Sequence, residues 1–225
     1  MTTQPKVPPL SKIVGVLLGL NVGVYLLQFL LGLPELSDQF ALWPLAVEGS
    51  RLARPGYTGP HFSLWQVLSY GFLHGSNLHL LVNMFALWMF GTHIERLWGS
   101  THFLFYYFFC LVGAGLVQLL VVTMETSSGG IVVPTIGASG AVFGLLLAFG
   151  MMFPNVKLLL LFFPVPIKAK YFVVLYGLLE LTLGVTRSNS GVAHFAHLGG
   201  MLFGIVLIQY WRGKLPWKPK YILQH

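Results

Sequence analysis

Charged side chains are scarce in this sequence. They make up 8% of its 225 residues, whereas soluble globular domains carry about 25%. Hydrophobic residues make up 56%, and the mean hydropathy is +0.76. This composition excludes an ordinary soluble domain and predicts an integral membrane protein.

Acidic residues and cysteine are scarcer still. Six Asp and Glu stand against 13 Lys and Arg, which gives a net charge of +7. We expect no nucleic-acid partner, because the basic residues lie between apolar runs rather than on one solvated face. The single cysteine, Cys110, excludes an internal disulfide, and its setting in FLFYYFFCLVGAG indicates a buried thiol.

Long apolar runs dominate the chain. A helix needs about 20 residues to cross a bilayer, and six runs can be drawn, at about 12–33, 67–90, 101–123, 139–153, 169–186 and 193–211. The first run is longer than the core of a signal peptide and no A-x-A-like cleavage site follows it, so we expect it to remain as a span. The predicted fold class is all-α: a polytopic membrane protein with six transmembrane helices. We expect a short cytoplasmic segment over 1–11, the membrane domain over 12–211 and a basic cytoplasmic tail over 212–225.

The fourth run is too short to cross the membrane. Its 15 residues, from Ser139 to Phe153, reach only about 22 Å as a helix. If Pro154 and Lys157 hold its far end at the surface, Ser139 must begin the helix inside the bilayer. The preceding ETSSGGIVVPTIGA then enters the membrane without regular structure, which is tolerated only against protein or a wet cavity. Ser139 is therefore predicted at the floor of a hydrated pocket.

The distribution of Lys and Arg predicts the orientation. Six spans put both termini on one side, and that side carries ten basic residues against three on the other. Basic residues favour the cytoplasmic side. We therefore expect cytoplasmic termini and a Ser139 end that opens to the exterior. The connection over 34–66, rich in Trp, Pro, Leu and Phe, is expected to lie partly in the headgroups.

The second run carries three polar side chains that lipid would make costly. His74, His79 and Asn83 lie in its exterior half, and His79 and Asn83 share a helix face. One such residue alone is more typical of a hydrogen bond between helices. Three together favour a site.

Glycine spacing predicts which helices meet. Gly140 and Gly144 have the GxxxG spacing that lets helix backbones approach closely, and the sixth run repeats this spacing from Gly200. Packing of the two faces brings the starts of the fourth and sixth helices together. Ser139 then lies beside His197, one turn before Gly200.

A serine beside a histidine offers nucleophilic chemistry. The hydroxyl becomes a nucleophile when the histidine takes its proton. His79, Asn83 and a backbone N–H at the start of the fourth helix are donors suited to an oxyanion. No intramembrane Asp is available to orient the histidine, and Glu180 is interpreted as a buried structural residue. The expected unit is a Ser/His pair without a third acid.

A metal site is the alternative use of the histidines. His74, His79, His194 and His197 all lie toward the exterior half, but the sequence lacks H-E-x-x-H and has no carboxylate nearby in sequence to act as a base. We expect no metal and no cofactor. A transporter is disfavoured because no long internal repeat is present.

Four motifs in order resemble those of the rhomboid family of intramembrane serine proteases. HGSNLHLLVN resembles the family's His, His and Asn pattern, GASG its nucleophile motif, and AHLGGMLFG its A-H-x-x-G-x-x-x-G around the base. GTHIERLWG resembles the G-x-x-x-E-x-x-x-G after the second span, which makes Glu95 a structural ligand of nearby backbone. The resemblance covers nearly the whole chain and implies a rhomboid-like bundle whose short fourth helix carries the nucleophile.

The resemblance also implies catalytic roles. Ser139 corresponds to the nucleophile and His197 to the general base. His79, Asn83 and the Ser139 backbone N–H correspond to the oxyanion contributors.

Three further residues are implied to have supporting roles: His74, His194 and Phe143. Phe143 stands where the family often has tyrosine, so its ring can stack on His197 but the phenolic hydroxyl is missing. His194 would lie one turn outward from the base.

The implied activity is hydrolysis of a peptide bond in or near a transmembrane segment of another protein. Substrates are expected to come sideways from lipid, past helix 169–186 with loop 187–192 as a cap. They are expected to unwind around weak helix formers, with a small residue such as Ala before the cut. The alternative is a catalytically inactive rhomboid-like membrane chaperone or dislocation factor, expected to have lost Ser139 or His197. The short six-span form predicts a bacterial inner membrane.

Overall fold

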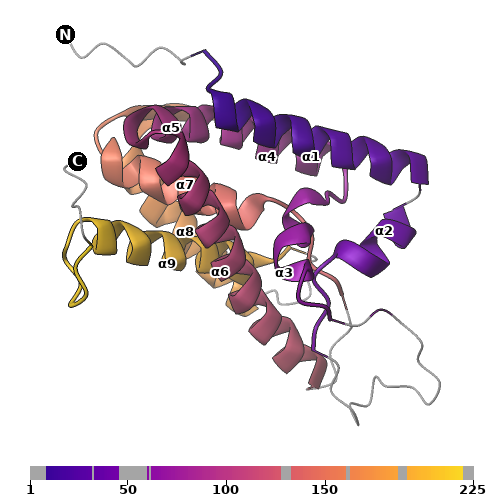
Figure 1. The fold of residues 1–225 in the computed structure, drawn as a ribbon. Coiled ribbons are helices and arrows are strands. Elements are labelled where there is room, and N and C mark those ends of the chain that lie inside the picture. The colour runs from indigo at the N-terminus through magenta and orange to yellow at the C-terminus, as the bar shows by residue number, and fades with distance from the viewer. Residues whose placement is uncertain are drawn as a thin grey trace.

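The computed structural model describes residues 9–31, 33–45, 60, 62–127, 133–160, 163–186 and 192–219. Its main elements are α1 (Lys12–Leu31), α4 (Asn77–Ala86), η2 (Leu87–Gly91), α5 (Thr92–Trp98), α6 (Ser100–Ser127), α7 (Ser139–Met152), α8 (Ala169–Thr186) and α9 (His194–Trp211). By length and composition α1, α6 and α8 can each cross a membrane, and α7 is a shorter apolar helix. The predicted helical membrane bundle is confirmed, and Figure 1 shows its arrangement.

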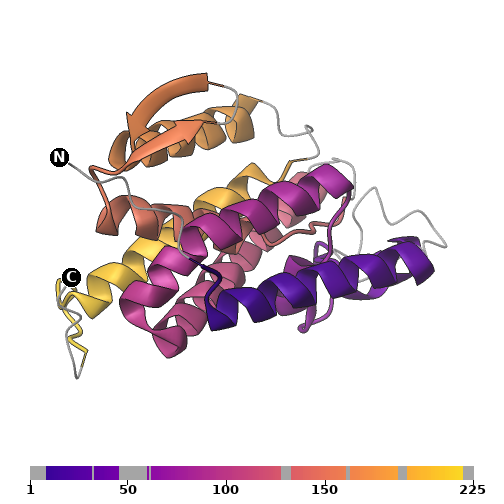
Figure 2. The same ribbon diagram turned by 90° about the horizontal axis from the view of Figure 1, so that it is seen from above.

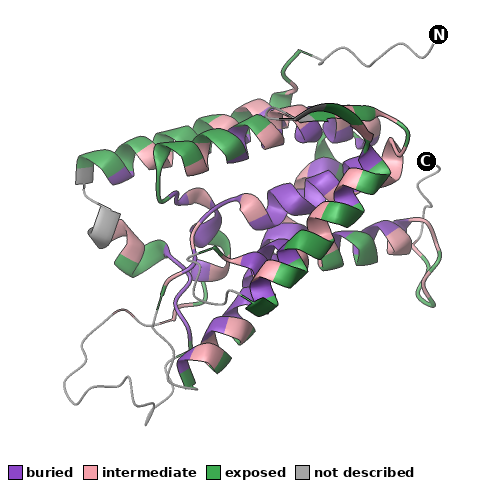
Figure 3. Cartoon of the chain, turned by 180° about the vertical axis from the view of Figure 1, so that it is seen from behind, coloured by how far each residue is buried: buried purple, intermediate pink, exposed green. Residues whose placement is uncertain are grey.

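The short helix α7 lies at the centre. Ten of its 14 residues are buried, and α6 and α9 pack against it and against each other. A helix that is apolar all round is expected in such an enclosed position. Burial is concentrated at the middle of the bundle, whereas α1 at the edge is largely exposed (Figure 3).

Glycines set the spacing between α7 and α9, as predicted. A β-carbon at Gly200 would collide with the carbonyl oxygen of Gly140, and one at Gly144 would lie 3.2 Å from the Gly200 oxygen. Gly204 instead faces the hydroxyl of Tyr106 on α6. The predicted contact between the two helices therefore forms at Gly140, Gly144 and Gly200, whereas Gly204 packs against the third helix, α6.

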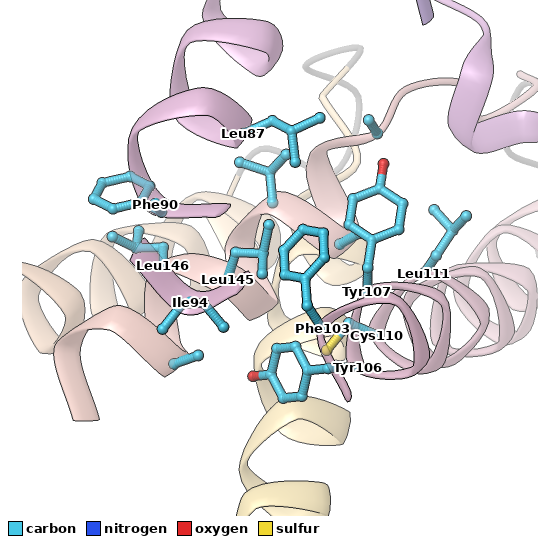
Figure 4. Close-up of a cluster of buried hydrophobic side chains, with 14 of the residues drawn as sticks. Leu87, Phe90, Ile94, Phe103, Tyr106, Tyr107, Cys110, Leu111, Leu145 and Leu146 are labelled. Atoms are coloured by element: carbon cyan, nitrogen blue, oxygen red, sulfur yellow. The ribbon is translucent and has the colours of Figure 1, made fainter. Parts of the chain in front are cut away.

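Aromatic side chains of α6 fill the space beside α7 (Figure 4). The Tyr106 hydroxyl donates to the Gly144 carbonyl at 2.8 Å, and the Tyr70 hydroxyl donates to the Leu111 carbonyl at 2.8 Å. These bonds satisfy the hydroxyls in an apolar interior. Cys110 is free and buried in this cluster, as predicted.

The second predicted span begins ten residues later than 67. Residues 66–72 form two short turns, α3 (Gln66–Ser69) and η1 (Tyr70–Phe72). Helix α4 starts at Asn77, because the Ser76 side chain accepts the His79 backbone N–H at 3.1 Å and caps it. The predicted start was placed from hydropathy, and hydropathy carries no information on a capping side chain.

Two short strands were not predicted. β1 (Lys157–Leu160) and β2 (Phe163–Lys168) pair antiparallel, with Lys157 opposite Lys168. Figure 2 shows this hairpin beside α8. Prolines at 164 and 166 disfavour a helix here, and the two strands pair with each other instead.

The long connection before α3 is described only in part. It begins with α2 (Leu33–Phe40), after which Leu42 pairs with Thr135. Residues 46–59 and 61 lie outside the described residues, as do residues 1–8, the 187–191 part of the expected cap and the tail over 220–225.

Candidate active site

Ser139 is the first residue of α7, where the short fourth run predicted it. The described backbone before it is irregular but paired. Thr135 and Leu42 exchange backbone hydrogen bonds of 2.9 and 3.0 Å, and the Gly137 N–H donates to the Tyr70 carbonyl at 2.9 Å. Such backbone is tolerated at membrane depth when protein surrounds it. Ser139 thus starts a helix inside the fold.

His197, in the first turn of α9, faces this serine. Its Nε2 lies 2.8 Å from Ser139 Oγ. The Phe143 ring stacks on the imidazole, with centroids 4.1 Å apart and planes 4° apart. Stacking fixes the ring plane, and the glycine contact between α7 and α9 fixes its distance. Of the two histidines in α9, His197 is the one against Ser139.

A carboxylate reaches the other nitrogen of His197. Nδ1 of His197 lies 2.8 Å from Oε2 of Glu180 on α8, and Nδ1 of His194 lies 2.7 Å from the same oxygen. Glu180 is 5% exposed. The prediction of a pair with no third acid is therefore wrong for the geometry.

Sequence reasoning missed this contact because Glu180 belongs to no motif and lies 17 residues from His197. The sequence did hold one indication of this contact, which is the high free energy of a carboxylate in an apolar membrane helix. A carboxylate within a membrane helix needs a partner, and the histidines at the start of the next helix were the nearest candidates.

One group of described residues has a donor set for a metal ion. The ligand atoms of Glu180, His194 and His197 lie within 4.8 Å of one another. Nitrogen and oxygen ligands at about 2.0–2.1 Å on a tetrahedral zinc are roughly 3.3 Å apart. The two nitrogen-to-oxygen distances of 2.7 and 2.8 Å are shorter and fit hydrogen bonds better.

The His79 ring of α4 lies near Ser139, and the Asn83 side chain bonds within its own helix. A β-carbon at Gly137 would lie 2.8 Å from His79 Nε2 and 3.7 Å from Ser139 Oγ, so the imidazole borders the space beside the serine. The Asn83 amide donates to the His79 carbonyl of its own helix at 2.9 Å. The amide nitrogen carries a second N–H, which that bond leaves available to an oxyanion.

His74 lies just before α4, as predicted, and is fully buried. Its backbone N–H donates to Gln28 on α1 at 2.9 Å, and its ring contacts His79 edge-on with centroids 5.1 Å apart. Neither ring nitrogen has a hydrogen-bond partner within the described part of the chain. The His74 ring therefore packs against His79.

A small cavity adjoins His194. It measures about 20 Å³, and Gln118, Glu125 and Gly184 also line it. One water molecule needs about 10–15 Å³ measured in this way. His194 therefore lies between the Glu180 carboxylate and a space large enough for one water.

Comparison with known proteins gives the family. The profile of the Rhomboid domain matches residues 61–213. Rhomboid protein 1, mitochondrial, from Saccharomyces cerevisiae is 31% identical over 209 residues, which cover 91% of this chain and 53% of the yeast protein. Presenilin-associated rhomboid-like protein A, mitochondrial, from Danio rerio is 33% identical over 64% of this chain and 38% of its own length. RHOMBOID-like protein 4 from Arabidopsis thaliana is 33% identical over 64% of this chain and 33% of its own length.

These relatives overturn the expected location. Two of the three are named as mitochondrial proteins, so the prediction of a bacterial inner membrane is wrong. The assignment of the termini to the cytoplasm and of the Ser139 end to the cell exterior is withdrawn for the same reason. The chain spans about half the length of the yeast relative and 38% and 33% of the lengths of the other two. With a Rhomboid domain match over 61–213 and this similarity along most of its length, the chain belongs to the rhomboid family.

Proposed function

We propose that this chain is an intramembrane serine endopeptidase of a mitochondrial membrane, which hydrolyses peptide bonds in or near transmembrane segments of other proteins. The observation that carries the proposal is the 2.8 Å distance between Ser139 Oγ and His197 Nε2. The family match and the mitochondrial relatives support it.

The reaction follows from these two side chains. His197 Nε2 takes the hydroxyl proton as Ser139 Oγ attacks the scissile carbonyl, and it then protonates the leaving amine. Water, deprotonated by the same nitrogen, hydrolyses the acyl-enzyme and frees Ser139. The Ser139 N–H has no intrahelical partner at the first position of α7 and stabilises the oxyanion together with His79. Asn83 joins them through the second N–H of its amide.

The substrate must present an unwound segment. A helical substrate hides its carbonyls in backbone hydrogen bonds, so weak helix formers such as Gly and Pro favour cleavage nearby. Lateral access past α8 is supported by its sparse packing. Only 22% of the residues in its membrane-spanning stretch are buried, and weakly packed elements move most readily.

The first prediction tests the nucleophile and the base. Purified protein in liposomes should cleave a transmembrane reporter, and Ser139→Ala and His197→Ala should each lower kcat by about 10³-fold or more. Ser127→Ala, an exposed serine on α6, is the matched control and should cleave normally. Equal cleavage by Ser139→Ala and wild type would refute the assignment. A folded wild type that cleaves no reporter and does not react with a fluorophosphonate would favour the inactive chaperone.

A further inference from the structure

Glu180 comes from α8, a helix that contributes no other group within hydrogen-bond distance of His197 among the described residues. We propose that Glu180 and His194 form a positioning pair for the base, so that Ser139, His197 and Glu180 make a hydrogen-bonded chain anchored on α8. The inference rests on the protease function proposed above.

The hydrogen-bond pattern fixes the tautomer of His197. An ionised carboxylate only accepts hydrogen bonds, so the Nδ1 atoms at 2.7 and 2.8 Å from Glu180 Oε2 both carry protons. A neutral His197 with a proton on Nδ1 has its lone pair on Nε2. That is the atom 2.8 Å from Ser139 Oγ. Glu180 therefore holds the ring in the form that can take the serine proton.

The same carboxylate stabilises the charged intermediate state. When His197 takes the proton it becomes an imidazolium in a site that also holds the titratable side chains of His79 and His194. An adjacent negative charge lowers the energy of that imidazolium, more strongly here than in water because the dielectric is low.

His194 holds the carboxylate in place. Burying a charge in a membrane is costly unless it is paired and hydrogen-bonded, and the His194 bond is the second one to Oε2. A single carboxylate oxygen bound by two rings on α9 cannot rotate away without breaking both bonds. His194 thus acts through Glu180.

A second contact ties α8 to the base. Tyr176, one turn before Glu180, stacks on Phe143 with centroids 5.2 Å apart and planes 10° apart. Phe143 in turn stacks on His197. The orientation of His197 therefore depends on the position of α8 through two contacts, the Glu180 hydrogen bond and the stack of Tyr176 on Phe143.

The second prediction separates this positioning role from a structural one. In Glu180→Gln the amide oxygen can still accept both ring N–H groups, but the negative charge that stabilises the His197 imidazolium is lost, so kcat should fall by about 10²–10³-fold, with KM unchanged within about threefold because no substrate contact is lost. Glu180→Asp keeps the carboxylate, and its kcat should be at least about tenfold higher than that of Glu180→Gln. Thr182→Val, on the exposed side of α8, is the control and should leave kcat unchanged.

His194 gives an independent comparison if Glu180→Gln fails to fold. His194→Asn keeps a donor near the position of Nδ1 and should retain most activity, whereas His194→Phe keeps the ring without the donor and should lower kcat by about tenfold. Thermal unfolding of each variant is measured alongside.

The outcomes distinguish this inference from the proposed function. Wild-type kcat in Glu180→Gln, or in His194→Phe, with an inactive Ser139→Ala would overturn the positioning role of Glu180 and His194 and leave the protease function intact. An Asp variant no better than Gln would also overturn it. A fully active Ser139→Ala would overturn the proposed function itself, whatever Glu180 does.

Discussion

Gly137 shows how one residue lets the His79 ring lie close to the backbone beside Ser139. Its φ is +122°, a conformation that residues with a side chain rarely adopt. A β-carbon there would also lie 2.7 Å from the His79 ring and would occupy the space next to Ser139. Both the backbone conformation and the close His79 ring therefore require glycine at this position.

Gly137→Ala tests that requirement and is the third prediction. The methyl group displaces His79 and strains the backbone, so kcat should fall at least about tenfold, and the free energy of unfolding should fall by about 1–3 kcal/mol. Cleavage of the reporter and thermal unfolding measure the two effects. Gly19→Ala on α1, where a β-carbon meets nothing within 4 Å, should change neither cleavage nor folding adversely. A Gly137→Ala protein with wild-type kcat would show that His79 and this space are not used.

At the scale of helices, the sequence predicts the start of a helix best where polar residues or the length of an apolar run mark it. The starts at Ser139 and His194 were predicted within one residue, because length and polar residues define them. The second helix was misplaced because a capping Ser76 and not hydropathy sets its start. Glu180 was assigned no partner because contacts between helices depend on rotation about their axes, which a single polar residue in an apolar run does not specify.

Helix α8 lies against α9 through glycine. A β-carbon at Gly184 would lie 3.2 Å from both the His194 Cβ and the Phe195 ring, whereas one at Gly177 would meet only the end of Met201 at 3.3 Å. The ring and the backbone-linked carbon yield little, and the methionine end is flexible. Gly184 therefore sets the distance between α8 and the histidines that bind Glu180.

The fourth prediction uses this pair of glycines. Gly184→Ala should push α8 outward by a few tenths of an ångström and lower kcat about three- to tenfold, because the Glu180 bonds to α9 lengthen. Gly177→Ala, seven residues away on the same helix, should keep wild-type kcat. Alanine favours a helix by roughly 1 kcal/mol over glycine, so a loss of activity does not come from a weaker helix. Equal kcat for the two variants would show that the position of α8 does not control the base.

At the scale of the whole molecule, Glu95 joins three helices on the side of the termini. It lies in α5, beyond the candidate spans. Its carboxylate accepts the Ile13 and Val14 N–H groups of α1 at 3.0 Å each, the Ser100 hydroxyl of α6 at 2.7 Å, and the Ser11 hydroxyl. The N–H groups at a helix start have no partner in their own helix. Glu95 thus caps α1 from another helix, the structural role that its motif implied.

This cap makes the stability of the bundle depend on pH, which is the fifth prediction. Burial raises the pKa of Glu95, but its four hydrogen bonds outweigh burial and hold that pKa below its ordinary value. A carboxyl whose pKa is lowered by folding contributes its stability above the unfolded value of about 4.3, and this contribution is lost as the pH falls through the folded pKa. Thermal unfolding in detergent should therefore show Glu95→Gln less stable by about 1–3 kcal/mol at neutral pH, with the gap to wild type closing in acid below about pH 4. Glu125→Gln, at the far end of α6, should follow the wild-type curve throughout. A constant gap between wild type and Glu95→Gln from pH 7 to pH 3 would mean that α1 is held by packing alone and not by the charge of Glu95.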